Sequence, residues 1–211
     1  IDAQATRKLE PALNPDTEFL GAIHLPDDEA GNCRQFALLL KDAARAIGAR
    51  FEFNTTVQPL DPAAPARLVV TQAGAPPAQR AFHHVVVCGG LESAALLHPL
   101  GLRVPMAAVY GYSVSAPIRE PLNAPRSALM DERYKVAITR LGNRVRVAGS
   151  AELGGTLAHR RPDALRTLYK VLQDWFPGAA QLSNCGPAVQ EWKGARPMLP
   201  AGPPVLGATG I

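Results

Sequence analysis

The stretch Val85-Val86-Val87-Cys88-Gly89-Gly90 decides how this chain is interpreted, because an apolar run ends there in two adjacent glycines. The β-branched run predicts a buried strand, and the following residues, Leu91 to His98, predict a helix. Glycine permits a tight turn between the two elements and lets a ligand approach the backbone closely. The segment therefore predicts a ligand-facing turn, or a glycine turn that only reverses the chain.

The segments on either side of this turn differ in character. Within residues 28–104, apolar residues recur at helical spacing from Asn32 to Gly48, and short strands follow. Within residues 105–202, alternating runs and the turn at Leu141-Gly142-Asn143 predict a mainly antiparallel sheet with one helix over Pro162 to Phe176. The fold class expected from these two halves is α+β.

Composition limits the function. The 211 residues are 47% hydrophobic and 19% charged, which is typical of a globular protein. A net charge of +4 and only 6% aromatic residues, with the basic residues scattered, argue against nucleic-acid binding. No apolar run is long enough to predict a transmembrane segment. Cys33, Cys88 and Cys185 show no CxxC spacing, so neither a disulfide framework nor a metal site is predicted.

A single arginine stands on an apolar segment stiffened by proline, Gly194-Ala195-Arg196-Pro197-Met198. The residue before a proline is held in extended geometry, so the side chain of Arg196 is displayed in a fixed direction. A guanidinium offers a rigid fork of donors that matches a carboxylate. The segment therefore predicts an anchor for a small carboxylate, or else an arginine that reaches solvent or pairs with a nearby acid.

Five segments, taken in chain order, resemble those of one enzyme family: Ile23–Asn32, Val109–Ser113, Met130–Arg140, Gly194–Pro200 and Val205–Thr209. Their order and spacing are similar to those of the D-amino-acid oxidase-like family of FAD-dependent oxidoreductases, and most of all to its bacterial D-amino-acid dehydrogenase branch. The resemblance implies that FAD is the cofactor. It implies oxidative deamination of D-amino acids to 2-oxo acids and ammonia, by hydride transfer from the substrate Cα to the flavin.

The resemblance also implies roles for particular residues. Arg196 falls on the arginine that grips the substrate carboxylate, and Tyr134, on a strand predicted from Tyr134 to Thr139, is similar to a tyrosine that donates to the same group. The positions that match the flavin side of the family are Val57, Cys88, Gly89, Gly90, Gly111 and Tyr112. No residue is identified as a catalytic acid or base.

On the same resemblance, residues 28–104 correspond to the middle of an FAD-binding domain. Residues 1–27 and 105–202 correspond to the substrate domain, and residues 203–211 to the start of the return to the FAD-binding domain. The GxGxxG turn that holds the FAD pyrophosphate in this family has no match in the sequence. The residue before Arg196 is alanine, where the family usually has a larger side chain.

The implied partners are a small amino-acid substrate and a quinone or respiratory-chain electron acceptor. The implied location is the cytoplasm or the periphery of the inner membrane. Two alternatives stand beside this interpretation. One is an amine oxidase of the glycine or sarcosine type that uses oxygen, and the other is a truncated fragment without catalytic activity by itself.

Overall fold

The structure is a computed structural model that describes residues 1–182 and 188–208, so Cys185 and residues 209–211 lie outside it. The chain divides into two compact units. Unit 1 comprises Ile1–Leu38 and Tyr110–Ala195, and unit 2 comprises Leu39–Val109 and Arg196–Ile211. These divisions differ from the predicted ones at residues 28, 105 and 203, and the assignment of a substrate part and a cofactor part remains a prediction.

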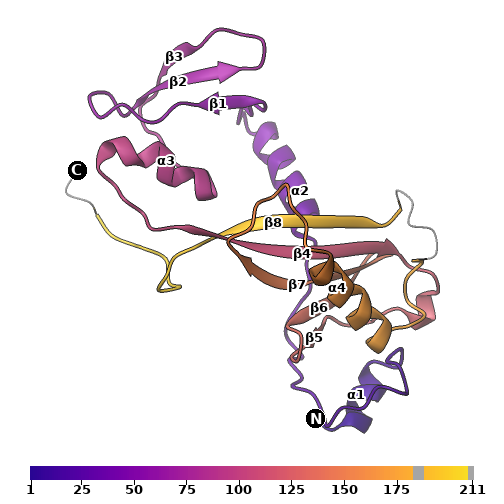
Figure 1. Ribbon diagram of the computed structural model, residues 1–211. Coiled ribbons are helices and arrows are strands. Elements are labelled where there is room, and N and C mark those ends of the chain that lie inside the picture. Colours follow the sequence, from indigo (N-terminus) through magenta and orange to yellow (C-terminus); the bar gives the residue numbers. More distant parts are fainter. Residues whose placement is uncertain (183–187, 209–211) are drawn as a thin grey trace. The chain divides into compact units, whose positions relative to one another are not determined.

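A five-stranded sheet forms the centre of unit 1 (Figure 1). Its strands, in spatial order, are β5 (Leu129–Asp131), β6 (Val136–Leu141), β7 (Arg144–Leu153), β4 (Ala107–Pro117) and β8 (Gln190–Met198). The pairs β5–β6 and β6–β7 are antiparallel. Gly142, with φ at 62°, makes the tight turn of the β6–β7 hairpin. The mixed architecture with antiparallel sheets confirms the α+β prediction.

Helix α4 (Pro162–Trp175) covers one face of this sheet, which is called here the covered face. Pro162 fits the first helical turn because an N–H group at that position would have no acceptor within the helix. The residues of α4 that are buried against the sheet are Leu168, Val171 and Leu172. They pack in one core with the sheet residues Tyr112, Val114, Val136, Ile138, Val145 and Val147. The opposite side of the sheet is called the open face.

The alternation of buried and less buried side chains along β7 shifts by one residue near the end of the strand. Val145 and Val147 are buried, and Ser150 then adopts a φ of 71° in the left-handed region. An extra residue of this kind is a β-bulge, which moves the following side chains to the other face. Glu152, an even-numbered residue, is consequently buried on the covered face with the odd-numbered valines.

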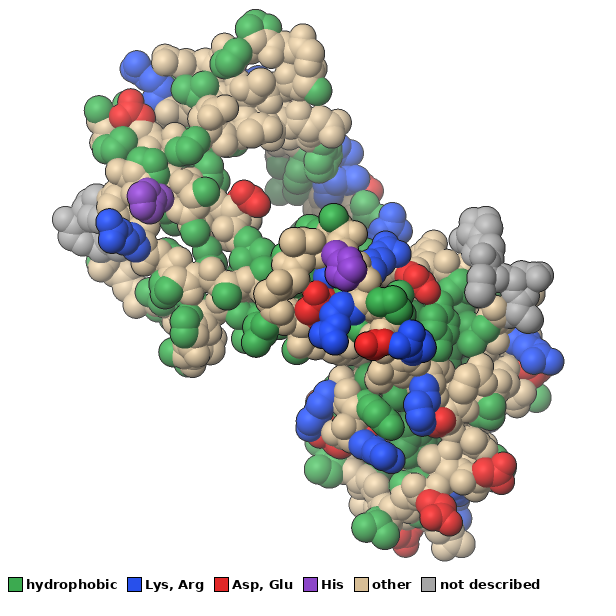
Figure 2. All heavy atoms as spheres, viewed as in Figure 1, with side chains coloured by type: hydrophobic (Ala, Val, Ile, Leu, Met, Phe, Trp, Pro, Cys, Tyr) green, Lys and Arg blue, Asp and Glu red, His purple; other side chains and the backbone are tan. Residues whose placement is uncertain are grey.

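Two helices precede the strands of this sheet in the sequence. Helix α1 (Ala3–Leu9) begins at Asp2, whose Oδ1 accepts from the N–H of Ala5 at 2.7 Å as an N-cap. Helix α2 (Cys33–Ala46) confirms the predicted helix, but none of its residues is buried. Figure 2 shows that apolar side chains are common on the visible surface, among interspersed basic and acidic ones.

Unit 2 contains a small antiparallel sheet in the order β1–β2–β3, made of Thr55–Val57, Arg67–Gln72 and Ala78–Ala81. Beyond it the chain forms short helical turns: η1 (Gly90–Glu92), α3 (Ser93–Leu97) and η2 (His98–Leu100). Another short turn, η3 (Pro121–Asn123), follows β4 in unit 1.

The strand predicted before the two glycines is wrong, because β3 ends at Ala81 and Val85–Cys88 belong to no strand. A strand needs a neighbour to bond its N–H and C=O groups, and none of the described strands pairs with this segment. The helix predicted over residues 91–98 is reduced to the five residues of α3 between 3₁₀ turns. Within residues 1–182 and 188–208, no helix combines the length and apolar character needed to cross a bilayer.

Candidate functional site

Arg196 lies near the end of β8, and its side chain is exposed. Pro197 follows it and holds the backbone extended, as the sequence predicts. Among the described residues, its guanidinium has no hydrogen-bond or ion-pair partner. The fork of donors is therefore available to an anionic ligand or to solvent.

Tyr134 lies in the turn between β5 and β6. The predicted strand is present, but its predicted start at Tyr134 is wrong, because β6 begins two residues later at Val136. Asp131 causes the difference, because its Oδ1 accepts from the N–H of Tyr134 at 2.9 Å and closes a local turn. The half-buried ring lies 5.2 Å from the Cζ of Arg133 and 5.5 Å from the Nζ of Lys170. Its hydroxyl makes no hydrogen bond within the part of the chain that the structure describes.

The predicted flavin contacts in unit 2 come from two neighbouring segments. Val57 ends β1, where it pairs with Val70. Cys88, Gly89 and Gly90 form an exposed turn. The two segments are linked three residues beyond Val57, where the N–H of Leu60 donates to the carbonyl of Leu96 in α3 at 3.1 Å. This hydrogen bond ties the loop after β1 to the helix that follows the diglycine turn.

Gly111 and Tyr112 are neighbours on β4 and face opposite sides of the sheet. Tyr112 is 2% exposed and belongs to the core under α4, so its ring has little surface to offer a ligand. Gly111 faces the other side of the sheet but is itself buried. Neither residue of this pair therefore presents an exposed surface to a ligand.

A buried ionic cluster, which sequence reasoning missed, lies beneath β8. Lys193 and Glu152 form an ion pair with the Nζ–Oε2 distance at 2.9 Å, and Tyr112 donates a hydrogen bond to the same carboxylate. The hydrogen bonds from Tyr112 and then from Lys193 hold the pKa of Glu152 below its ordinary value of 4.5, against the effect of burial. Burial acts to lower the pKa of Lys193, but its hydrogen bonds with Glu152 and Tyr112 outweigh burial and raise the pKa above 10.5.

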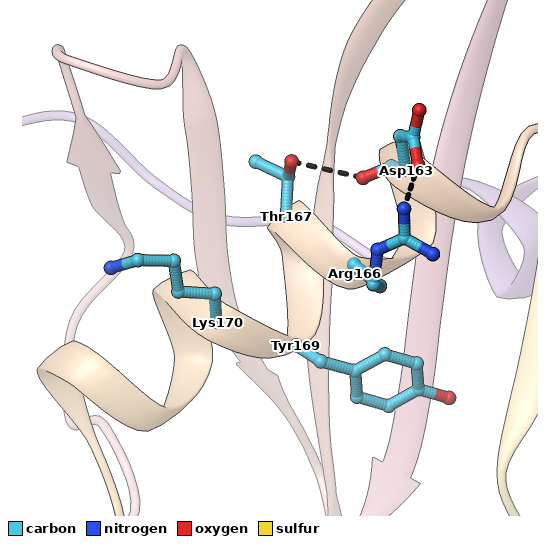
Figure 3. Close-up of a pocket in the computed structure, with 5 residues that line it drawn as sticks. All are labelled: Asp163, Arg166, Thr167, Tyr169 and Lys170. Carbon is cyan, nitrogen blue, oxygen red and sulfur yellow. Dashed lines mark hydrogen bonds and ion pairs between the residues drawn. The ribbon is translucent and has the colours of Figure 1, made fainter.

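A shallow depression on the surface of α4 is a less favourable candidate (Figure 3). It is lined by Asp163, Arg166, Thr167, Tyr169 and Lys170, all from the one helix. Its charged groups are already paired, Arg166 with Asp163 and Lys170 with Asp174. None of the residues predicted from sequence lines it. The structure also groups no set of three His, Cys, Asp or Glu residues suited to a metal ion among the residues it describes.

All 211 residues match the family described as FAD dependent oxidoreductase (DAO). The chain therefore belongs to the DAO family of FAD-dependent oxidoreductases, which confirms the family expected from its motifs.

Curated relatives point to one branch of the family. The chain is 42% identical over 211 residues to a D-amino acid dehydrogenase of Rhodopseudomonas palustris (strain HaA2), covering 99% of this chain and 48% of that protein. It is 44% identical over 204 residues to a D-amino acid dehydrogenase of Bradyrhizobium diazoefficiens, covering 95% of this chain and 46% of that protein. The chain thus spans about half the length of these relatives.

Solved structures establish the shared fold. A glycine oxidase from Geobacillus kaustophilus superimposes with a TM-score of 0.80 at 22% identity, covering 100% of this chain and 54% of that one. An L-proline dehydrogenase from P. horikoshii gives a TM-score of 0.77 at 14% identity, covering 99% of this chain and 55% of that one.

The diglycine turn fits the family's cofactor in part. Gly90 has a φ of 57°, and no heavy atom lies within 4 Å of the place a Cβ would take, so its backbone is open to a ligand. The α-helix that follows has only five residues, which leaves no long helix to supply a phosphate site at its N-terminus. The turn fits close approach of a dinucleotide, while no GxGxxG turn is present for the pyrophosphate.

Proposed function

We propose that this chain provides the substrate-carboxylate anchor and part of the flavin-facing surface of an FAD-dependent D-amino-acid dehydrogenase. The proposed reaction converts a D-amino acid to a 2-oxo acid and ammonia. The observation that carries the proposal is the 42% identity to a D-amino acid dehydrogenase along all 211 aligned residues. The unpaired guanidinium of Arg196, in the segment that matches the family motif, supports it.

Arg196 binds the substrate through its carboxylate. Two parallel N–H donors engage the two oxygens, which fixes the orientation of the acid group as well as its position. β8 and the following Pro197 restrict the backbone of Arg196, whereas its exposed side chain is ordered only when it binds the carboxylate. Tyr134 is proposed to add one hydroxyl donor to the same carboxylate, but the strand order does not support this: Tyr134 lies between β5 and β6 at one edge of the sheet, and β8 is the strand at the other edge.

The residues proposed to meet FAD are Val57, Cys88, Gly89, Gly90, Gly111 and Tyr112. Gly89 and Gly90, in an exposed turn, would act through their backbone, whereas Gly111 is buried. For Tyr112 the proposal is indirect, because its buried ring supports β4 from below while Gly111 faces the open side. FAD, when bound, supplies the two-electron oxidation by accepting the hydride from the substrate Cα.

Orientation is the main contribution of the protein in this proposal. The substrate amine has to be neutral when its Cα–H bond breaks, and no side chain here is assigned as the base. An anchored carboxylate holds the Cα–H bond in one direction, and such positioning supplies a large share of a rate enhancement. The imine product then hydrolyses in water to the 2-oxo acid.

One experiment tests cofactor and substrate class together. The purified chain is titrated with FAD and followed by flavin absorbance, and D-alanine is then added without oxygen. We expect bleaching of the bound flavin by D-alanine, with L-alanine as the control. Reoxidation by a soluble quinone rather than by oxygen supports the dehydrogenase, whereas fast reoxidation by oxygen and bleaching by glycine identify an oxidase of the glycine or sarcosine type.

The second candidate is a fragment without activity by itself. The observation that favours it is the apolar surface left uncovered, since α2 has no buried residue and Leu20 and Ile23 are 100% and 89% exposed. A purified chain that stays colourless after incubation with FAD establishes this alternative and refutes the first proposal for this chain.

A further inference from the structure

Lys193 is a buried lysine of the five-stranded sheet, and all three N–H donors of its ammonium group have partners. Its side chain is 1% exposed. The ammonium pairs with Glu152 Oε2 at 2.9 Å and donates to the carbonyls of Thr156 at 2.8 Å and His159 at 2.7 Å. An ammonium has three N–H donors and no acceptor. Lys193 is therefore neither a free nucleophile nor an available acid.

Aromatic rings complete the enclosure. The Nζ of Lys193 lies 4.4 Å from the centroid of the Tyr110 ring and 5.2 Å from that of Tyr112. Tyr112 in turn donates to Glu152 and accepts from the N–H of Arg161 at 3.1 Å. The cluster thus joins β4, β7 and β8 with the loop at residues 154–161, all within unit 1.

The other side of β8 carries a different contact. Trp192 and Gly194 flank Lys193 in sequence and therefore face the open side. Trp192 is 57% exposed, yet its indole lies directly on Gly194. A Cβ atom placed on Gly194 would stand only 1.8 Å from Cη2 of the indole. The indole takes the space of the missing side chain, which explains why the residue is a glycine and why it is buried.

From this arrangement we propose that Lys193 is a positioning residue that fixes β8 from the covered face and so holds the indole of Trp192 on Gly194 at the open face. The two contacts hold the same three residues from opposite sides. Arg196 follows on the same strand, so the consequence for the substrate rests on the proposed function, whereas the positioning does not.

The physical reason is the cost of an unpaired buried charge. Without the ammonium, the carboxylate of Glu152 keeps only the hydrogen bond from Tyr112 and two loop carbonyls lose their donor, so water has to enter or the groups have to separate. Either change loosens the link that Lys193 makes from β8, across its neighbour β4, to β7 and the loop. The indole of Trp192 on the opposite face then changes its position on the backbone of Gly194.

Fluorine NMR of the chain labelled with 5-fluorotryptophan tests this directly. The chain has two tryptophans, Trp175 and Trp192, so two signals are expected, and Trp192→Phe assigns them. In Lys193→Met we expect the Trp192 signal to shift by more than its linewidth or to broaden at least about twofold, and the Trp175 signal to move less. Lys8→Met, which removes an exposed lysine at the end of α1, is the control and is expected to move neither signal.

A lysine that only stabilises the fold gives a different result. In that case Lys193→Met lowers the unfolding temperature but leaves the Trp192 signal of the folded chain unchanged, and the proposal is overturned. If Lys193→Met does not fold, Glu152→Gln keeps the shape of the acceptor without its charge and is expected to shift the Trp192 signal in the same direction. An unmoved Trp192 signal in folded Glu152→Gln also overturns the proposal.

The unmodified chain provides a test without any substitution. Protonation of Glu152 at acid pH removes the partner of Lys193, so the Trp192 signal is expected to move below pH 4.5 before the chain unfolds. A Trp192 signal that stays constant until global unfolding contradicts the proposal. None of these measurements needs FAD, so a chain that gives the expected shifts but stays colourless refutes the proposed function and leaves the positioning role standing.

Discussion

The indole Nε1 of Trp175 donates to Oδ2 of Asp131 across 2.6 Å, which ties the last residue of α4 to the end of β5. The second oxygen of the same carboxylate accepts from the N–H of Tyr134 at 2.9 Å. Asp131 is 7% exposed, so both donors depend on it for a partner. The turn that carries Tyr134 is therefore held from the helix as well as from the sheet.

Asp131→Ala is expected to lower the free energy of unfolding by about 1–3 kcal/mol, because two half-buried donors lose their acceptor. Urea unfolding followed by circular dichroism measures the change. Glu132→Ala in the same turn removes an exposed partner of Lys135 and is expected to cost less than about 0.5 kcal/mol. Equal losses for the two variants contradict a special role for Asp131.

Arg196→Ala is expected to lower kcat/KM for a D-amino acid at least about a hundredfold in the FAD-loaded protein, because the substrate carboxylate loses its bidentate partner. Steady-state assays with a dye acceptor measure the effect. Arg103→Ala, another exposed arginine of unit 2, is the matched control and is expected to leave kcat/KM within about twofold. A change of threefold or less in Arg196→Ala places the carboxylate anchor elsewhere.

Tyr134→Phe is expected to cost far less, about two- to tenfold in kcat/KM, since a single neutral hydroxyl contributes about 0.5–1.5 kcal/mol. The loss is expected in KM more than in kcat, because the hydroxyl would bind the carboxylate equally in the ground and transition states. No change at all removes Tyr134 from the proposed site and leaves it as a packing residue between Arg133 and Lys170.

Gly194→Ala is expected to destabilise the chain by about 1 kcal/mol, because the new methyl group displaces the indole of Trp192 from the strand. The same substitution in a Trp192→Ala background is expected to be neutral or stabilising, since alanine restricts the unfolded chain more than glycine does. A double-mutant cycle from urea unfolding measures this coupling. Additive effects of the two substitutions show that the ring does not lie on the glycine in solution.

The stability difference between the wild-type chain and Glu152→Gln is expected to depend on pH. Because the pKa of Glu152 is lowered by folding, its contribution is present above 4.5 and is lost as the pH falls through the lowered value. Because the pKa of Lys193 is raised, its contribution is present below 10.5 and is lost as the pH rises above it. Urea midpoints are expected to differ most at pH 7 and to approach each other as the pH falls below 4.5. A gap that stays constant from pH 7 to pH 3 contradicts the lowered pKa.

Local patterns predicted much of unit 1. The periodic apolar residues behind Pro162 predicted α4, and the turn at Leu141-Gly142-Asn143 predicted the β6–β7 hairpin, because both depend on neighbours in sequence. The five ordered sequence motifs also predicted the family, because they can be recognised without knowledge of tertiary contacts. The segment Val85–Cys88 failed because its apolar character says nothing about whether a partner strand is present.

The buried cluster lay beyond prediction from the sequence. A lysine in the stretch Glu191-Trp192-Lys193 is usually a surface residue, and nothing nearby in the sequence marks it as buried. Its partners come from positions 152, 156 and 159, and they meet it only when the sheet forms. For Tyr134, the strand propensity of the following residues masked the turn that Asp131 imposes.

The left-handed residue in β7 makes the backbone conformation of an uncharged residue a determinant of charge balance. The φ of Ser150 interrupts the alternation, and Glu152 then lies on the side of the Lys193 ammonium. If Ser150 took ordinary extended geometry, plain alternation would send the carboxylate to the opposite face and remove the anionic partner of Lys193, although no ionisable residue had been replaced. Deleting Ser150 would instead leave Glu152 on the same face, so a change of conformation at this position acts as a charge mutation and the loss of the residue does not.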